Sequence, residues 1–249
     1  MRYITLVLLL GGLLCTIPLC AAASVVDATA AEQAYQSGDF AAAKDGFTAA
    51  VSQFRAASKD SGDYRVYREA MYLYDRLADC SFTQRDWPAL KLYMDGLMVV
   101  GESELNLAQT QLSGALASGI AYATAEYLRE RVDESVRIAS IIQLKRSLSL
   151  LLLDSQGEGA TGEAAIAQYQ ALAAALQGVV TLQDGYYVLD VPTLEKKLDQ
   201  FDAIFGELEK LGDMQALWKK YPPEGSADAD KPAQPAEPEG GAETPAGGK

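Results

Sequence analysis

Between residues 24 and 221 the chain contains only two prolines, Pro88 and Pro192, although the whole sequence has nine. Proline disrupts helices, whereas alanine and leucine, which dominate this stretch, have high helix propensities. Apolar residues recur here at intervals of three and four, which is the period of a helix with one buried face. The stretch is long enough to bury a sizeable core as one domain. We therefore expect an all-α domain over residues 24–221.

The periodicity predicts a run of helices joined by short polar or glycine-rich loops. The helices are expected at residues 29–37, 40–57, 64–82, 87–100, 104–130, 133–153, 163–177, 192–211 and 213–221, with loops at 58–63 and 154–162. Gly101-Glu102-Ser103 is expected to be a break, and Asp133 is expected to cap a helix. Residues 179–189 differ, because β-branched and aromatic residues flank Asp184-Gly185. They predict a small β-hairpin that packs against the helices.

The first 23 residues have the features of a cleaved signal peptide. Arg2 gives a positive start, an apolar core follows, and Ala21-Ala22-Ala23 provides a cleavage site. We therefore expect export, with the mature chain in a bacterial periplasm. A lipoprotein signal would need a small residue before Cys20, and Leu19 is bulky. Membrane association is expected only if Cys20 is lipidated.

Residues 222–249 form a compositionally separate tail. They contain six of the nine prolines and no Val, Ile, Leu, Met or aromatic residue. Such a segment cannot bury enough apolar surface to offset the entropy lost on ordering, so we expect a disordered tail.

Composition excludes several kinds of chemistry. The chain has no histidine, which removes Ser-His-Asp and Cys-His catalysis and histidine-based metal sites. Its net charge of −13 makes nucleic acid and anionic lipid poor partners. Cys80 is the only cysteine outside the signal peptide, so we expect a buried thiol and no internal disulfide. We expect no cofactor and no metal.

The sharpest enzymatic hint is Glu102-Ser103, followed by Asn106. These residues resemble the Glu-Ser start of lytic transglycosylases, in which a glutamate acts as general acid on a sugar bond. The Gly-Leu-Met-Gln block of that family is absent. Glu102 and Ser103 also suit the start of a helix, where a hydroxyl and a carboxylate are favourable. We therefore expect a protein that is not an enzyme; an envelope hydrolase would need Glu102 in a deep cleft.

Residues 31–51 read A-E-Q-A-Y-Q-S-G-D-F-A-A-A-K-D-G-F-T-A-A-V. Ala31 and Ala34 fit a first helix, Gly38-Asp39-Phe40 fits a turn, and Ala43 with Phe47 makes an A-x3-F step. This pattern resembles a tetratricopeptide (TPR) helix hairpin. The resemblance implies a stack of helical hairpins that binds or assembles other proteins and carries no chemistry of its own.

The repeat does not continue at the TPR period of about 34 residues, but a spacing of 47 aligns more positions. The aligned pairs are Ala31 with Ala78, Tyr35 with Phe82, Asp39 with Asp86, Phe40 with Trp87, and Ala42 with Ala89. A second step of 47 brings Ala125 and Asp133 into the same columns. Each aspartate is then expected to start the second helix of a hairpin.

These observations predict a TPR-like helical hairpin stack, either an open α-solenoid or a compact bundle. We expect it to be a non-catalytic scaffold or adaptor that binds a protein or peptide partner in the cell envelope. Four tyrosines are candidates to line the binding groove: Tyr64, Tyr67, Tyr72 and Tyr74. The other interpretation of these tyrosines is that most belong to the core or its rim.

The alternative function is binding of a small or lipidic ligand in an enclosed helical cavity. Four other tyrosines would lie near that cavity: Tyr122, Tyr127, Tyr186 and Tyr187.

Overall fold

The computed structural model describes residues 27–57, 62–119, 122–183 and 186–223. The expected signal peptide with Cys20, residues 58–61, the Asp184-Gly185 turn and the expected tail beyond residue 223 lie outside the described residues. Within the described ranges the fold is all-α with one small antiparallel sheet, as the sequence predicts. None of the helices in these ranges is both long and apolar enough to span a bilayer.

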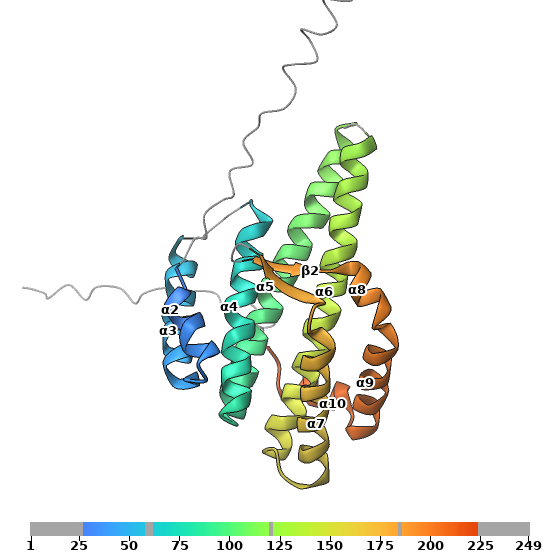
Figure 1. Cartoon of the computed structure of the whole chain (residues 1–249). Coiled ribbons are helices and arrows are strands. Elements are labelled where there is room, and N and C mark those ends of the chain that lie inside the picture. Colours follow the sequence, from blue (N-terminus) through green and yellow to red (C-terminus); the bar gives the residue numbers. More distant parts are fainter. Residues whose placement is uncertain (1–26, 58–61, 120–121, 184–185, 224–249) are drawn as a thin grey trace, which may run out of the picture.

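The described ranges contain nine helices: α2 (Thr29–Gln36), α3 (Phe40–Ala57), α4 (Tyr64–Thr83), α5 (Trp87–Ala117), α6 (Tyr122–Ser155), α7 (Gly159–Leu176), α8 (Val191–Lys196), α9 (Leu198–Leu211) and α10 (Met214–Lys220). Successive helices from α2 to α7 pack on one another in sequence order. In Figure 1, α2 and α3 lie at the left, and α4, α5 and α6 follow towards the right. After the hairpin, α9 packs back on α7 and α10 packs on α6. This stack of helical hairpins is compatible with a TPR-like repeat fold.

The 47-residue spacing holds for the first two hairpins. Asp39 and Asp86 each accept a hydrogen bond, at 3.1 Å, from the backbone N–H three residues further along the chain. The preceding residues, Gly38 and Arg85, both adopt left-handed backbone conformations. The two turns therefore close in the same way, and each aspartate starts the second helix of its hairpin.

The break expected at Gly101-Glu102-Ser103 is wrong, because α5 runs through it without interruption. Gly101 is buried where α5 approaches α6, and a Cβ on it would lie 2.8 Å from Cδ1 of Ile142. The Ser103 hydroxyl donates to the Val99 carbonyl one turn earlier, so it caps nothing. The glycine serves close helix packing here and does not end the helix.

The expected helix start at Asp133 is also wrong. Asp133 is exposed near the middle of α6, which is one helix from Tyr122 to Ser155. The chain turns instead just after Ser118, where Gly119 has a φ of 66°. The second step of the 47-residue spacing therefore fails. In Figure 1 the adjoining ends of α5 and α6 project beyond the other helices.

The helix expected at 192–211 is divided at Lys197 into α8 and α9. The Lys197 Nζ donates to the carbonyl oxygens of Ala175 and Gln177, at 2.9 and 2.6 Å. These carbonyls lie at the end of α7, where helix carbonyls lack partners within the helix. Lys197 thus closes α7, and its own backbone departs from helical geometry, with a φ of −112°.

The β-hairpin forms as expected. Strands β1 (Val180–Gln183) and β2 (Tyr186–Leu189) are antiparallel, with Val180 opposite Leu189 and Gln183 opposite Tyr186. β2 lies against α4 (Figure 1), and Tyr187 is buried. The helices therefore supply the support that a two-stranded sheet needs.

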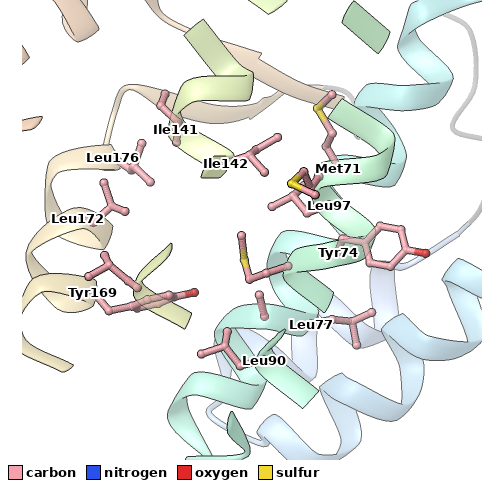
Figure 2. Packing of buried hydrophobic residues seen from close by; sticks show 14 of the residues in the cluster. Met71, Tyr74, Leu77, Leu90, Leu97, Ile141, Ile142, Tyr169, Leu172 and Leu176 are labelled. Carbon is pink, nitrogen blue, oxygen red and sulfur yellow. The ribbon is translucent and has the colours of Figure 1, made fainter. Parts of the chain in front are cut away.

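The main core lies between α4, α5, α6 and α7, as Figure 2 shows. Buried aliphatic side chains from these helices meet there, among them Met71, Leu77, Leu90, Leu97, Ile142 and Leu172. The ring of Tyr169 stacks on Phe82, with centroids 4.2 Å apart. The apolar run at residues 147–153 is largely buried.

Cys80 is a free, buried thiol in α4, which confirms the sequence prediction. Burial and the nearby Asp79 carboxylate raise the pKa of this thiol to about 11. A thiol with so high a pKa is unreactive at neutral pH.

Candidate binding groove

The four tyrosines predicted to bind a partner have different environments along α4. Tyr72 and Tyr74 are buried, with exposed fractions of 8% and 6%. Tyr64 and Tyr67 are partly buried, and the guanidinium of Arg131 covers the Tyr64 ring at 3.6 Å from its centroid. The first two side chains thus belong to the core, whereas the other two are partly buried outside it.

The tyrosines considered for an enclosed cavity are also separated. Tyr122 and Tyr127 are exposed on the projecting end of α6, whereas Tyr187 is buried beneath the β-hairpin. Neither of the two grooves described below is lined by any of these side chains or by Tyr186.

A groove of about 810 Å³ separates α6 from α9, and α10 closes one end of it. We call it the α6–α9 groove. Its lining comprises Val136, Arg137, Ser140, Ile141, Gln143, Leu144 and Ser147 of α6; Leu194 of α8; Leu198, Phe201, Asp202, Phe205, Leu208 and Glu209 of α9; and Gly212, Asp213, Met214, Gln215 and Trp218. None of these positions was singled out as a site from the sequence.

Large apolar side chains are unusually exposed on the walls of this groove. Val136, Leu198, Phe205 and Trp218 have exposed fractions of 44%, 48%, 53% and 37%. They are four of the nine large apolar side chains that are exposed in the described residues. Scattered single exposures are ordinary on a protein surface, but a cluster within one groove marks a binding surface.

The groove exists because α9 has more apolar surface than its packing requires. Phe201, Ile204 and Leu208 are buried, and α9 packs mainly on α7. Leu198 and Phe205 are seven residues apart, so they lie on one side of the helix and face the groove. Leu198 and Phe205 are recognisable as surplus apolar positions only once the packing of α9 on α7 is known, so no local sequence signal identifies this site.

Trp218 is held in place at the α10 end of the groove. Its indole N–H donates to the Ser147 hydroxyl at 3.3 Å, and the Arg146 guanidinium lies 5.7 Å from its ring centroid. Arg146 is buried and donates to Asp95 at 2.8 Å. Asp213 caps α10 by accepting the Ala216 N–H at 3.1 Å. The end of the groove is therefore preorganised by contacts to α5 and α6.

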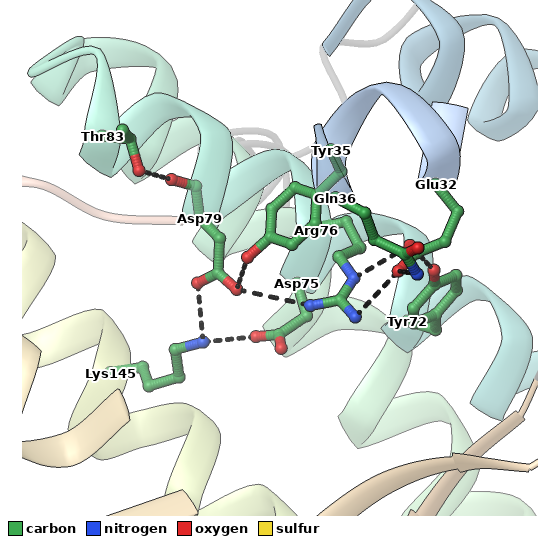
Figure 3. Close-up of polar contacts among 9 residues, drawn as sticks. All are labelled: Glu32, Tyr35, Gln36, Tyr72, Asp75, Arg76, Asp79, Thr83 and Lys145. Carbon is green, nitrogen blue, oxygen red and sulfur yellow. Dashed lines mark hydrogen bonds and ion pairs between the residues drawn. The ribbon is translucent and has the colours of Figure 1, made fainter. Parts of the chain in front are cut away.

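The most prominent cluster of buried charge lies away from the groove. The ammonium of Lys145 forms ion pairs with Asp75 and, at 3.6 Å, with Asp79 (Figure 3). Burial favours the neutral amine, but Asp75 and its other acidic neighbours outweigh burial and raise the pKa of Lys145. A catalytic lysine needs a lowered pKa. This lysine therefore suits ion pairing rather than nucleophilic chemistry.

The same cluster ties the first hairpin to the body. Tyr35 of α2 donates to Asp79 at 3.4 Å, and Arg76 of α4 donates to Glu32 of α2 at 3.2 Å. Tyr72 also donates to Glu32. Figure 3 shows these side chains bridging α2, α4 and α6.

A second buried ion cluster lies beneath the β-hairpin. Arg68 donates to Glu104 at 3.1 Å, to Glu134 at 3.0 Å and to the Tyr187 carbonyl at 3.2 Å. Arg131 lies 3.6 Å from the same Glu104 carboxylate. Glu104 is completely buried, so this cluster links α4, α5, α6 and β2.

Glu102, the candidate general acid, is exposed on α5 and lines neither groove described here. The second groove, of about 570 Å³, lies beside Asp154 at the α6–α7 turn. The Asp154 carboxylate pairs with Lys220 and accepts from the Tyr221 hydroxyl at 3.0 Å. In the described residues, no group of three or more Cys, Asp or Glu side chains is placed to hold a metal ion.

Comparison of the chain with protein-family models, curated proteins and solved structures finds no match. The α6–α9 groove therefore provides the basis for a functional proposal.

Proposed function

We propose that this chain is an exported, non-catalytic scaffold or adaptor that binds a protein or peptide partner in the bacterial cell envelope. The partner docks in the α6–α9 groove. The observation that carries this proposal is the cluster of four exposed apolar side chains on the walls of one groove. Covering such surface removes apolar area from water, which is favourable by about 25 cal/mol per Å², and the part of this gain that exceeds the cost of association contributes to affinity.

The shape of the groove favours a helical segment as the docking element. The α6 wall runs from Val136 to Ser147, which corresponds to about 16 Å, or three helical turns. Helical segments bind such grooves by inserting apolar side chains spaced three, four and seven residues apart. We also propose that the first two hairpins are divergent TPR units. Their equivalent turns at Asp39 and Asp86 support this relationship.

A lipidic ligand is the alternative occupant. The volume of about 810 Å³ falls in the range of small-molecule sites, and the lining is largely apolar. A site for such a ligand usually encloses most of its surface. The α6–α9 groove instead has four apolar side chains that remain accessible from outside, which favours a partner larger than the groove.

Two matched double variants test this function. Val136→Ser with Leu198→Ser removes apolar surface from the groove. Val99→Ser with Leu92→Ser removes the same residue types from positions of similar exposure, 47% and 41%, that do not line it. Each variant and the wild type are used to capture proteins from envelope extracts. Purified candidates are then titrated directly against all three.

The proposal predicts a partner that binds the wild type and the Val99/Leu92 variant equally. Its affinity for the Val136/Leu198 variant should fall at least about tenfold, as expected for losing two half-buried apolar contacts. Equal binding to all three proteins would contradict groove docking. Binding of extracted lipid, and of no protein, would favour the alternative.

Export has a separate test, the mass of the mature N-terminus. A chain beginning at Ser24 would agree with cleavage after Ala23. A chain beginning at a lipid-modified Cys20 would place the protein on a membrane and contradict a soluble periplasmic form.

A further inference from the structure

The α9 rim of the groove has two carboxylates on the same side of the helix. Asp202 and Glu209 are seven residues apart and both line the groove. This separation corresponds to about 10 Å along the helix axis. Both residues are exposed, and neither has an ion pair or hydrogen-bond partner within the described residues.

Arg137, the one basic side chain that lines the groove, and Lys210, which follows Glu209 in the chain, are both engaged in ion pairs. Lys210 pairs with Glu207 at 2.7 Å, on the part of α9 that does not line the groove. Arg137, on the α6 wall, pairs with Glu195 at 3.3 Å. The rest of the α6 wall is uncharged, because it consists of apolar, Ser and Gln side chains. The groove is therefore apolar inside, acidic along α9 and neutral along α6.

From this arrangement we infer that the partner is a basic amphipathic helix of about three turns, and this inference rests on the function proposed above. The apolar face of the helix packs between Phe205 and Val136. Lysine or arginine side chains about seven residues apart, on the flank facing α9, pair with Asp202 and Glu209. The net charge of −13 also attracts a cationic partner from a distance.

The chain's own C-terminal tail does not have this chemistry. Residues 222–249 contain no Val, Ile, Leu, Met or aromatic side chain to fill the groove. They also contain six acidic residues against two lysines, so their net charge has the same sign as that of the α9 rim. The occupant is therefore a separate molecule.

Three synthetic peptides of about four helical turns distinguish the sources of affinity. The first has leucine on one face and lysine on its flanks. The second has the same leucines with glutamate in place of lysine. The third keeps the lysines and replaces the leucines with serine. Each is labelled with a fluorophore, and its binding to the full mature chain is measured by anisotropy at low and high salt.

Two charge-matched variants separate the rim from the general acidity of the protein. Asp202→Asn with Glu209→Gln removes the rim carboxylates. Asp199→Asn with Glu163→Gln removes the same two residue types from exposed positions in α9 and α7 that do not line the groove. Circular dichroism verifies that each variant retains its helices.

The inference predicts that only the leucine–lysine peptide binds tightly. The Asp202/Glu209 variant should bind it about tenfold more weakly at low salt, with a smaller difference at high salt. The Asp199/Glu163 variant should remain within about twofold of the wild type. The Val136/Leu198 variant, which has unchanged charge, should also lose affinity.

The other outcomes overturn the inference in distinguishable ways. If the leucine–glutamate peptide binds as tightly and depends on Val136 and Leu198, the groove function stands and the basic partner is wrong. If lysine peptides bind without any dependence on Val136 and Leu198, the attraction is non-specific charge. If no peptide binds while an envelope partner still needs the groove, the helical, basic occupant is wrong. The proposed function itself fails when partner binding is insensitive to the groove variant, or when the groove binds lipid and no protein.

Discussion

Asp39 and Asp86 lie 47 positions apart in the sequence and perform the same task in two successive hairpins. Each accepts a backbone hydrogen bond at 3.1 Å from the residue three positions ahead and so starts the second helix of its hairpin. They differ in one respect, because Asp86 also forms an ion pair with Lys44 of α3, at 2.7 Å. Asp86 therefore joins one hairpin to the next as well as capping its own helix.

Replacing either aspartate with alanine should lower the free energy of unfolding. We expect a loss of about 1 kcal/mol for Asp39→Ala, which is typical of a lost N-cap. Asp86→Ala should cost up to about 1 kcal/mol more, because the pair with Lys44 is lost as well. Urea unfolding measures both. Asp133→Ala is the control and should change stability by less than about 0.5 kcal/mol, since Asp133 is exposed within α6. A loss at Asp133 equal to that at Asp39 would contradict this account of the turns.

The ion pair at Asp86 also predicts a pH dependence. The hydrogen bond from Lys44 holds the pKa of Asp86 below its ordinary value of 3.8. A carboxylate with a lowered folded-state pKa stabilises the fold above its unfolded pKa, and this stabilisation disappears as pH falls through the folded pKa. Asp86→Asn retains a capping group but removes the charge. Its unfolding free energy should lie below that of the wild type near about pH 6 and converge with it under acid conditions. If the unfolding free energies of the two proteins differ by the same amount at every pH in this range, the ion pair between Asp86 and Lys44 does not contribute to stability.

Substitution in the buried cluster around Glu104 should lower the free energy of unfolding much more than substitution on the exposed surface of the same helix. Glu104→Gln leaves Arg68 and Arg131 with less negative charge to compensate them, and we expect a loss of several kcal/mol, about 3–5 for a broken buried pair. Glu102→Gln, two positions away and exposed, should be nearly neutral. Thermal unfolding of the two variants provides the comparison. Similar, small losses for both would show that the cluster adds little to the fold.

Cys80 should be protected from modification until the protein unfolds. Its thiol is buried and its pKa is raised to about 11, so little reactive thiolate exists near neutral pH. We expect a thiol reagent to label the native mature chain very slowly and the urea-unfolded chain rapidly. Labelling in native buffer at the rate of an exposed cysteine would mean that α4 is not packed as described.

Local sequence signals predicted those elements of the fold whose structure depends on neighbouring residues in the chain. The starts of α3 and α5 follow from capping aspartates, and the β-hairpin follows from β-branched and aromatic residues around Asp184-Gly185. The break predicted at Gly101 failed because its reason is tertiary: this glycine faces Ile142 on a helix that is distant in sequence. A glycine at a close helix contact and a glycine at a turn have the same local sequence signal.

Local sequence signals could not predict the buried charges or the groove. Lys145 and Arg146 interrupt an apolar run in the sequence, yet they are buried because Asp75 and Asp95 approach from other helices. The α6–α9 groove forms because α9 packs mainly on α7 and only weakly on α6. Leu198 and Phe205 could be recognised as surplus apolar positions only once that packing was known.

The most direct test of the central claim is backbone hydrogen exchange of the mature chain, free and bound to the partner captured from the envelope. Docking in the α6–α9 groove predicts added protection in two segments, residues 136–147 of α6 and 198–209 of α9, with the first hairpin unchanged. Added protection confined to the first hairpin or to α4, with the groove segments unchanged, would contradict the account.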